Sequence, residues 1–168
     1  FRHLARGFGV IRFVGVVDRL YAEAEEECER GEQGQGESWA AHRRQLYRRS
    51  AGHRRRRIDN GGMTVAVVGA SSDRRKFGNK AMRAFAAAGH KVIPINPNEA
   101  SVEGAPAYAS VTDVPEPIDM ATVYVPPEIG IGLLDGFELK KIAEIWINPG
   151  AESDELIAEA RRRKLNVI

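Results

Sequence analysis

The sequence predicts an α/β fold built around a doubly wound parallel sheet, and three features of residues 63–168 support this prediction. Short apolar runs alternate with segments of helical periodicity, which is the pattern of successive βαβ units. The first run, Val65 to Val68, is unbroken, as in a strand that is buried on both faces. Glycine, proline and asparagine gather after these runs, at the strand ends where such sheets bind their ligands.

The first βαβ unit has a separate signal for each of its elements. We expect a strand over residues 64–68, because the apolar run ends at Gly69. The following periodic segment predicts a helix over 79–88, and the apolar residues of 90–95 predict the second strand. Pro94 has no backbone N–H for the sheet ladder, so we expect it near the end of its strand or on an unpaired side.

The second half of this region repeats the alternation. Residues 101–117 are expected to be mostly loop, because prolines punctuate them, with a short strand near Ala107 and Tyr108. The remaining elements are expected as strands over 119–125 and 143–147, helices over 128–137 and 153–163, and the start of a last strand over 165–168. Right-handed crossovers between these strands would place helices on both faces of the sheet.

Residues 1–62 differ in composition from the rest of the chain. They contain many arginines and no lysine, and they end in a run of four arginines, Arg54–Arg57, before a glycine pair. Three interpretations remain open: a nucleic-acid-contacting extension, a solvated tail, or sequence foreign to the natural protein. We favour the third, because Met63 immediately precedes the first strand. We therefore expect a poorly structured Arg-rich arm over 1–62 and the folded domain over 63–168.

The overall composition excludes several classes of protein. The formal net charge is only +2, and no apolar run approaches the roughly 20 residues of a membrane span. We therefore expect no membrane partner. The single cysteine, Cys28, cannot form an internal disulfide, which favours a cytoplasmic protein. CxxC and HExxH patterns are absent, so we expect no metal site.

Four turns at the predicted carboxyl edge of the sheet are the candidate site. The glycine-containing loop before the first helix suits a phosphate, because open amides and the positive end of a helix dipole meet there. Three cations in the same loop add positive charge. The candidate binding residues are Gly69, Ala70, Ser71, Arg74, Arg75, Lys76, Asn96, Pro97, Val125, Pro126, Pro127, Asn148, Pro149 and Gly150.

The sequence disfavours two common nucleotide ligands. The GxGxxG fingerprint of NAD-binding loops is absent, and Ser71 stands in place of its second glycine. Asn96 replaces the acidic residue that would bind the ribose hydroxyls. The phosphate-binding motif GxxxxGK[ST] is also absent, which disfavours ATPases and GTPases. An NADP-dependent oxidoreductase, with the phosphate held by an atypical basic loop, remains the alternative.

Three stretches of the sequence resemble the CoA-binding domain family. They are VAVVGASSDRRKFGNKAMRAFAAAGHKVIPINPN, YASVTDVPEPIDMATVYVPPE and IWINPGAESDELIAEARRRKLNVI, and together they cover residues 63–168 almost throughout. Members of this family are small, often free-standing Rossmann-like proteins, similar to the N-terminal domain of the succinyl-CoA synthetase α subunit. The family continues beyond the last strand into a cysteine-containing segment and a further helix, so we expect this domain to be truncated at its C-terminus.

The resemblance implies a role for each turn in binding coenzyme A or an acyl-CoA. The loop at Gly69, Ala70 and Ser71 would face the pyrophosphate. Arg74, Arg75 or Lys76 would meet a phosphate, either the ribose 3′-phosphate or the pyrophosphate. The remaining turns would border the adenosine end (Asn96, Pro97), line the pantetheine arm (Val125, Pro126, Pro127) and lie near its far end (Asn148, Pro149, Gly150).

The sequence offers no catalytic set, so we expect a non-catalytic CoA or acyl-CoA binding module. The related synthetases phosphorylate a histidine in a second domain, and that domain is missing here. His3, His42 and His53 lie in the arm, while His90 lies in the turn that enters the second strand. Ser71 could be proposed as a nucleophile, but no base stands among the strand-end residues.

Overall fold

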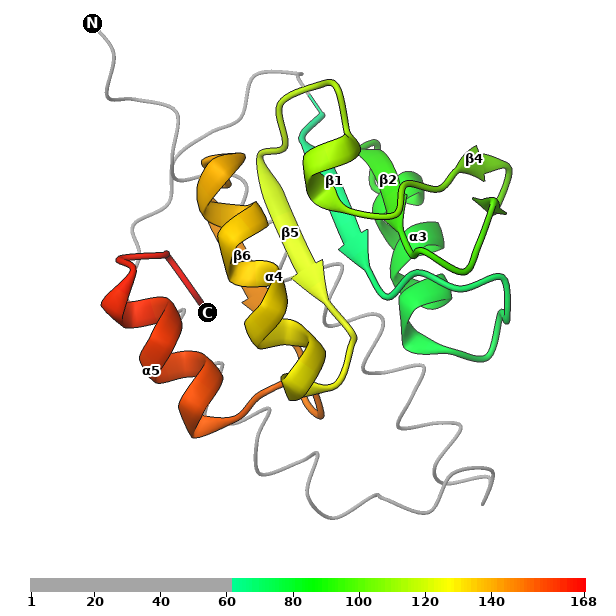
Figure 1. Cartoon of the computed structure of the whole chain (residues 1–168). Coiled ribbons are helices and arrows are strands. Elements are labelled where there is room, and N and C mark those ends of the chain that lie inside the picture. Colours follow the sequence, from blue (N-terminus) through cyan, green and yellow to red (C-terminus); the bar gives the residue numbers. More distant parts are fainter. Residues whose placement is uncertain (1–61) are drawn as a thin grey trace, which may run out of the picture. The chain divides into compact units, whose positions relative to one another are not determined.

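The computed structural model describes residues 62–168, which form a parallel sheet of four strands covered by helices (Figure 1). The strand order is β2-β1-β5-β6. Strand order reverses between β1 and β5, because β2 lies on one side of β1 and the later strands on the other. The strands are β1 (Thr64–Val68), β2 (Lys91–Ile95), β5 (Met120–Val123) and β6 (Glu144–Ile147). The predicted α/β doubly wound, Rossmann-like fold is therefore confirmed.

Helices cover both faces of this sheet (Figure 1). Helix α3 (Phe77–Ala87) connects β1 to β2 and buries Met82 and Phe85. Helices α4 (Pro127–Leu139) and α5 (Asp154–Arg162) contact each other and lie across the opposite face. A single-turn 3-10 helix, η1 (Val111–Asp113), contacts α4.

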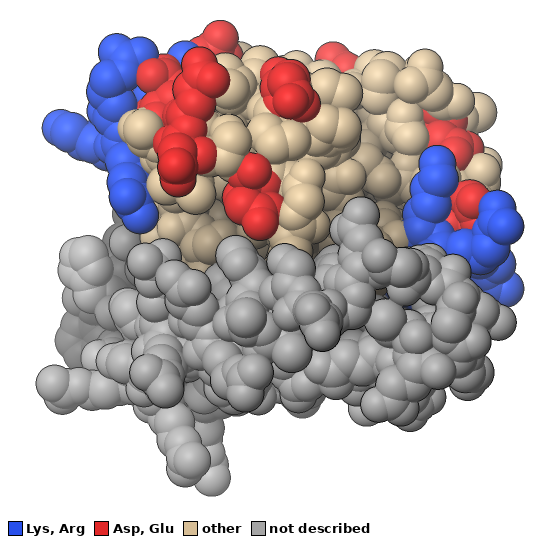
Figure 2. Space-filling model, turned by 90° about the horizontal axis from the view of Figure 1, so that it is seen from below, with Lys and Arg blue, Asp and Glu red and all other residues tan. Residues whose placement is uncertain are grey.

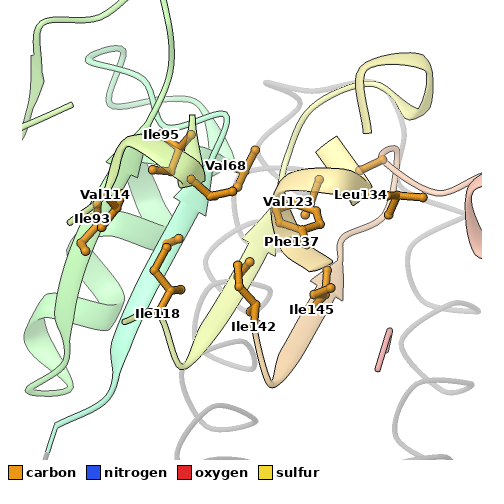
Figure 3. Packing of buried hydrophobic residues seen from close by; sticks show 14 of the residues in the cluster. Val68, Ile93, Ile95, Val114, Ile118, Val123, Leu134, Phe137, Ile142 and Ile145 are labelled. Atoms are coloured by element: carbon orange, nitrogen blue, oxygen red, sulfur yellow. The ribbon is translucent and has the colours of Figure 1, made fainter. Parts of the chain in front are cut away.

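The main hydrophobic core lies between the sheet and the α4–α5 layer (Figure 3). Val68 and Val123 extend from neighbouring strands toward Leu134 and Phe137 of α4 in this cluster. Val67 is fully buried but does not belong to the cluster, because successive strand residues point to opposite faces. Burial on both faces explains why the sequence of β1 has no polar alternation.

Two of the helices begin at residues that commonly start helices. The Ser153 Oγ accepts a hydrogen bond from the Leu156 backbone N at 3.1 Å, so Ser153 is the N-cap of α5. Pro127 occupies the first turn of α4, where its missing N–H has no intrahelical partner to lose. Both helices begin at the carboxyl edge of the sheet, directly after β5 and β6.

Pro94 lies where the sequence predicts, near the end of its strand and with its ring nitrogen away from the neighbouring strand β1. Its carbonyl oxygen accepts from the Tyr108 backbone N at 3.0 Å, on the side of β2 that faces away from β1. The Pro94 ring nitrogen faces the same way, so the absent N–H removes nothing from the β1–β2 ladder. A proline is thus accommodated next to the strand's last residue.

The segment after β2 differs from its prediction. Instead of a strand at 107–108, it contains an antiparallel hairpin of β3 (Ser101–Val102) and β4 (Ala105–Pro106). Glu103 and Gly104 form its turn with positive φ angles of 49° and 81°. The prediction missed this turn because a glutamate in the left-handed region has no sequence signal. Tyr108 forms only an isolated bridge to Ile95.

The last residues of the chain pair with β6. Val167 forms a parallel bridge to Ile145, and the Ile145 backbone N donates to the Asn166 carbonyl oxygen at 2.9 Å. This agrees with the start of a strand that the sequence predicts at 165–168. Of the predicted arm, residues 1–61 lie outside the described residues, and so do Cys28 and three of the four histidines.

The helices of the described region do not suit a membrane span. The longest of them, α4, has 13 residues, whereas a bilayer requires about 20 apolar residues in a helix. This finding covers residues 62–168.

Candidate functional site

The loop between β1 and α3 turns sharply at Gly69. Its φ of +87° lies in the left-handed region, and its backbone N donates to the Ile95 carbonyl oxygen at 2.9 Å. A Cβ at this position would lie 3.0 Å from Val125 Cγ1 and 3.1 Å from the Tyr124 carbonyl carbon. The loop passes directly beside the turn that follows β5. Only glycine fits here, because a side chain would disfavour this backbone angle and would crowd Val125 and Tyr124.

The first turn of α3 presses against the same loop through Gly78. A Cβ on Gly78 would lie 2.2 Å from the Gly69 carbonyl oxygen. Gly78 is the next glycine after Gly69 in the sequence, and no role was predicted for it. Its position at the start of a helix, after a glycine-containing loop, was the available signal, since the last glycine of dinucleotide-binding loops has this packing function.

A buried asparagine joins the loop to its surroundings. The Asn79 side chain is fully buried, and its Nδ2 donates to the Ser71 carbonyl oxygen at 2.8 Å and to Glu103 Oε1 at 2.9 Å. Its Oδ1 accepts from Arg83 Nε at 3.0 Å. Asn79 thus fixes the loop to α3 and to the β3–β4 hairpin, a role that the sequence pattern did not indicate.

Hydrogen bonds between the ends of neighbouring strands bring the predicted turns together at one edge of the sheet. The Asn96 Nδ2 donates to the Ala70 carbonyl oxygen at 2.7 Å, which joins the turn after β2 to the loop after β1. The Tyr124 backbone N donates to the Val68 carbonyl oxygen at 2.8 Å, and the Asn148 backbone N donates to that of Val123 at 3.2 Å. All four turns therefore follow neighbouring strands of the sheet, in the order β2-β1-β5-β6.

The individual residues of these turns differ in exposure. Ala70, Ser71 and Asn148 are buried, and Asn148 Nδ2 donates to Thr122 Oγ1 at 2.8 Å and to the Val123 carbonyl oxygen at 2.9 Å. Half-buried or exposed are Gly69, Asn96, Pro97, Val125, Pro126, Pro127, Pro149 and Gly150. The buried polar groups hold the turns in place, whereas the other residues of the turns lie partly or fully at the surface.

The loop cations are exposed, but two of them form ion pairs. The Arg75 guanidinium binds both oxygens of Asp73 at 3.0 Å, and these hydrogen bonds lower the pKa of Asp73 to about 2. Arg74 Nε lies 3.3 Å from Glu103 Oε1. Lys76 is exposed at the N-terminus of α3. The sequence predicted that one or another of these cations meets a phosphate; in the structure Arg74 and Arg75 pair with carboxylates of the chain instead.

The same mixture of charges is visible on the surface. On the described part of the surface, Figure 2 shows acidic side chains beside each visible group of basic side chains.

A carboxylate from another turn already occupies the donors of the loop. Glu99 Oε1 accepts from the Ser72 backbone N at 2.9 Å, from Ser72 Oγ at 3.0 Å and from Ser71 Oγ at 3.4 Å. The hydrogen bond from the Ser72 amide is the main cause that lowers the pKa of Glu99. Glu99 was not predicted as a site residue, because its contact with Ser72 joins residues 27 positions apart.

Tyr124 is the first residue after β5 and precedes the turn at Val125, Pro126 and Pro127. Burial of its phenol raises the pKa of Tyr124 to about 12, although a hydrogen bond with Thr122 opposes the shift. Thr122 also accepts from the Asn148 side chain, so these polar groups connect the ends of β5 and β6. The phenol is therefore neutral at physiological pH and serves as a hydrogen-bonding group rather than a base.

His90 lies away from this edge. The Met63 backbone N donates to His90 Nδ1 at 3.2 Å, where the chain enters β1 and β2. This places His90 at the amino edge of the sheet, as the sequence predicts.

The fold and the four gathered turns define a Rossmann-like α/β domain with its candidate site at the point where strand order reverses. A family model described as a CoA binding domain matches residues 63–168, and the chain belongs to this family. The resemblance noted in the sequence is thereby confirmed.

Known proteins that the chain resembles include both enzymes and small single-domain proteins. It is 40% identical over 63 residues to the alpha subunit of an ADP-forming acetate–CoA ligase II from Pyrococcus furiosus, which covers 37% of this chain and 14% of that protein. A solved structure of a conserved hypothetical protein from Pyrococcus furiosus has a TM-score of 0.59 and 30% identity, covering 62% of this chain and 90% of that one. The dinucleotide-forming acetyl-coenzyme A synthetase 1 of Ca. Korarchaeum cryptofilum has a TM-score of 0.56 and 31% identity, covering 63% of this chain and 25% of that one.

Proposed function

We propose that residues 63–168 bind coenzyme A or an acyl-CoA as a non-catalytic module, with the ligand's diphosphate at the β1–α3 loop. The observation that carries this proposal is the anion already held there: the Ser72 amide and the hydroxyls of Ser71 and Ser72 bind the Glu99 carboxylate. Phosphate oxygens seek the same kind of donors at the start of a helix. The close packing of Gly78 on Gly69 supports the fit, because it keeps side-chain atoms away from the loop backbone.

The proposed path of the ligand follows the order of the turns. Lys76 and Arg74 are exposed at the start of α3, where they suit the ribose 3′-phosphate or the diphosphate, with Arg75 beside them. The turn at Asn96 and Pro97 would border the adenosine. The turns after β5 and β6 would line the pantetheine arm and its far end. We place this binding protein in the cytoplasm, since the one cysteine of the sequence favours a reducing compartment.

The chemistry of the loop supports binding without catalysis. Ser71 Oγ accepts from the Asp73 backbone N at 3.2 Å and donates to Glu99 at 3.4 Å. Glu99 has a lowered pKa, and such a carboxylate is a weak general base near neutral pH. Ser71 therefore lacks the activation that a nucleophile requires.

Titration calorimetry on the whole chain tests the proposal. CoA and acetyl-CoA should bind with micromolar dissociation constants that rise with salt concentration, because phosphate contacts are ionic. NADPH should displace CoA only weakly. Absence of a binding heat with CoA and acetyl-CoA would reject the proposal, and strong displacement by NADPH would favour the oxidoreductase alternative.

A further inference from the structure

We propose that Glu99 is an internal competitor of the ligand: its carboxylate occupies the diphosphate position at Ser72 and lowers the affinity of the site. This inference rests on the proposed function and deepens it. Glu99 Oε1 lies 2.9 Å from the Ser72 backbone N and 3.0 Å from Ser72 Oγ, which are hydrogen-bond distances. A phosphate oxygen that used these donors would have to take the place of the carboxylate.

Glu99 reaches the β1–α3 loop from the turn that follows β2, the neighbouring strand. Glu99 follows β2 by four residues, and its backbone N lies 3.4 Å from the Asn96 carbonyl oxygen in the turn. Asn96 itself holds the loop through Ala70. The carboxylate is therefore directed to the loop by the turn after β2, at the edge where the ligand enters.

Carboxylates lie beside the loop cations while Glu99 is in this position. Arg75 binds Asp73 and Arg74 lies beside Glu103, while the positive charge of Lys76 contributes to the lowered pKa of Glu99. Each of the three loop cations thus lies near a carboxylate, and Arg83, whose guanidinium lies 3.5 Å from the Arg74 carbonyl oxygen, adds a further positive charge. A diphosphate that approached the Ser72 donors without displacing Glu99 would be repelled by its carboxylate, at a distance where unit charges interact appreciably.

Displacement of Glu99 does not require the β3–β4 hairpin to move. Glu103 is held separately, by the buried Asn79 Nδ2 at 2.9 Å and by Arg74. Asn79 also keeps the Ser71 carbonyl oxygen in place at 2.8 Å. The loop backbone thus keeps its shape when the Glu99 side chain rotates outward, and the Ser72 amide becomes available to the ligand.

The experiment is calorimetry of Glu99→Gln with CoA and with dephospho-CoA, which lacks the 3′-phosphate. The substitution keeps the size of the side chain and removes its charge. We expect both ligands to bind about fivefold tighter or more, because one repulsive charge beside the diphosphate is gone. Glu116→Gln is the matched control, since Glu116 pairs with Lys91 at the other end of β2, and its affinity should equal that of the wild type.

Three results would overturn the inference. Unchanged or weaker CoA binding by Glu99→Gln, with wild-type binding intact, would show that Glu99 does not compete. Weaker binding by both Glu99→Gln and Glu99→Ala would make it a positioning residue that organises the loop. Tightening for CoA but not for dephospho-CoA would place the 3′-phosphate, not the diphosphate, at Ser72. Failure of the proposed function itself is distinct, because the wild type, both Glu99 variants and the Glu116 control would then all lack a CoA binding heat.

Discussion

Gly78 touches Gly69 so closely that a Cβ on Gly78 would lie 2.2 Å from the Gly69 carbonyl oxygen. This contact sets the first turn of α3 against the loop that follows β1. The loop can therefore present its amides and hydroxyls at the edge of the sheet, where the Ser72 donors already hold the Glu99 carboxylate. The contact has consequences for both stability and binding.

Replacing Gly78 by alanine should destabilise the fold and weaken CoA binding together. The added methyl group meets backbone atoms, which cannot rotate away, so we expect a loss of about 1–3 kcal/mol in the free energy of unfolding. Urea denaturation measures it. The matched control is Gly132→Ala in α4, where an added Cβ meets nothing within 4 Å. That control should be stabilised by about 0.5–1 kcal/mol, because alanine favours a helix interior; equal effects at the two sites would contradict the packing argument.

Removing the buried hydrogen bonds of Asn79 should loosen the loop. Asn79→Ala leaves the Ser71 carbonyl oxygen and the Glu103 carboxylate without this donor, at a cost of about 1–3 kcal/mol. Asn79→Asp should cost more, because an oxygen then faces both acceptors. Chemical denaturation gives both values. Asn98→Ala, in the exposed turn after β2, should stay within about 0.5 kcal/mol of the wild type; an Asn79→Asp variant as stable as Asn98→Ala would refute this role.

The Asp73–Arg75 pair should give the loop a defined response to acid. The native pKa of Asp73, about 2, is below the value of roughly 3.9 for an unfolded chain. Its contribution to stability is therefore complete above pH 3.9 and is lost as the pH falls through about 2. Carboxyl-carbon NMR titration should locate this pKa. In Arg75→Gln it should rise toward the ordinary value, and an unchanged titration would show that Arg75 is not the cause.

Lys76→Ala should weaken CoA binding about three- to tenfold at 0.1 M salt, because one cation at the start of α3 is lost. The difference from the wild type should shrink as salt is added. Calorimetry at several salt concentrations measures this. The control is Arg161→Ala, which removes an equal charge from the exposed far end of α5. Equal weakening by both variants would indicate a general charge effect instead of a local contact.

Much of the fold was predictable from the sequence because the relevant signals are local. The unbroken apolar run before Gly69 marks a strand buried on both faces, and Ser153 and Pro127 mark two helix starts. Parallel alternation then brings the ends of all four strands to one edge. The prediction that the four turns meet there needed only the parallel alternation of strands and helices, and no side-chain detail.

The finer features of the candidate site depend on contacts between distant residues. Glu99 and Ser72 are 27 positions apart, and Asn79 meets Glu103 across 24 positions. Neither contact leaves a pattern in the sequence. The ion pairs of Arg74 and Arg75 were missed for the same reason: a run of cations indicates charge, but not which carboxylates the fold places beside it.

A crystal structure of the chain with bound CoA tests the central claim most directly. We predict that the diphosphate lies at the β1–α3 loop within hydrogen-bonding distance of the Ser72 amide, with the Glu99 carboxylate rotated away from it. A diphosphate bound elsewhere, with Glu99 still on the Ser72 amide, would contradict the account.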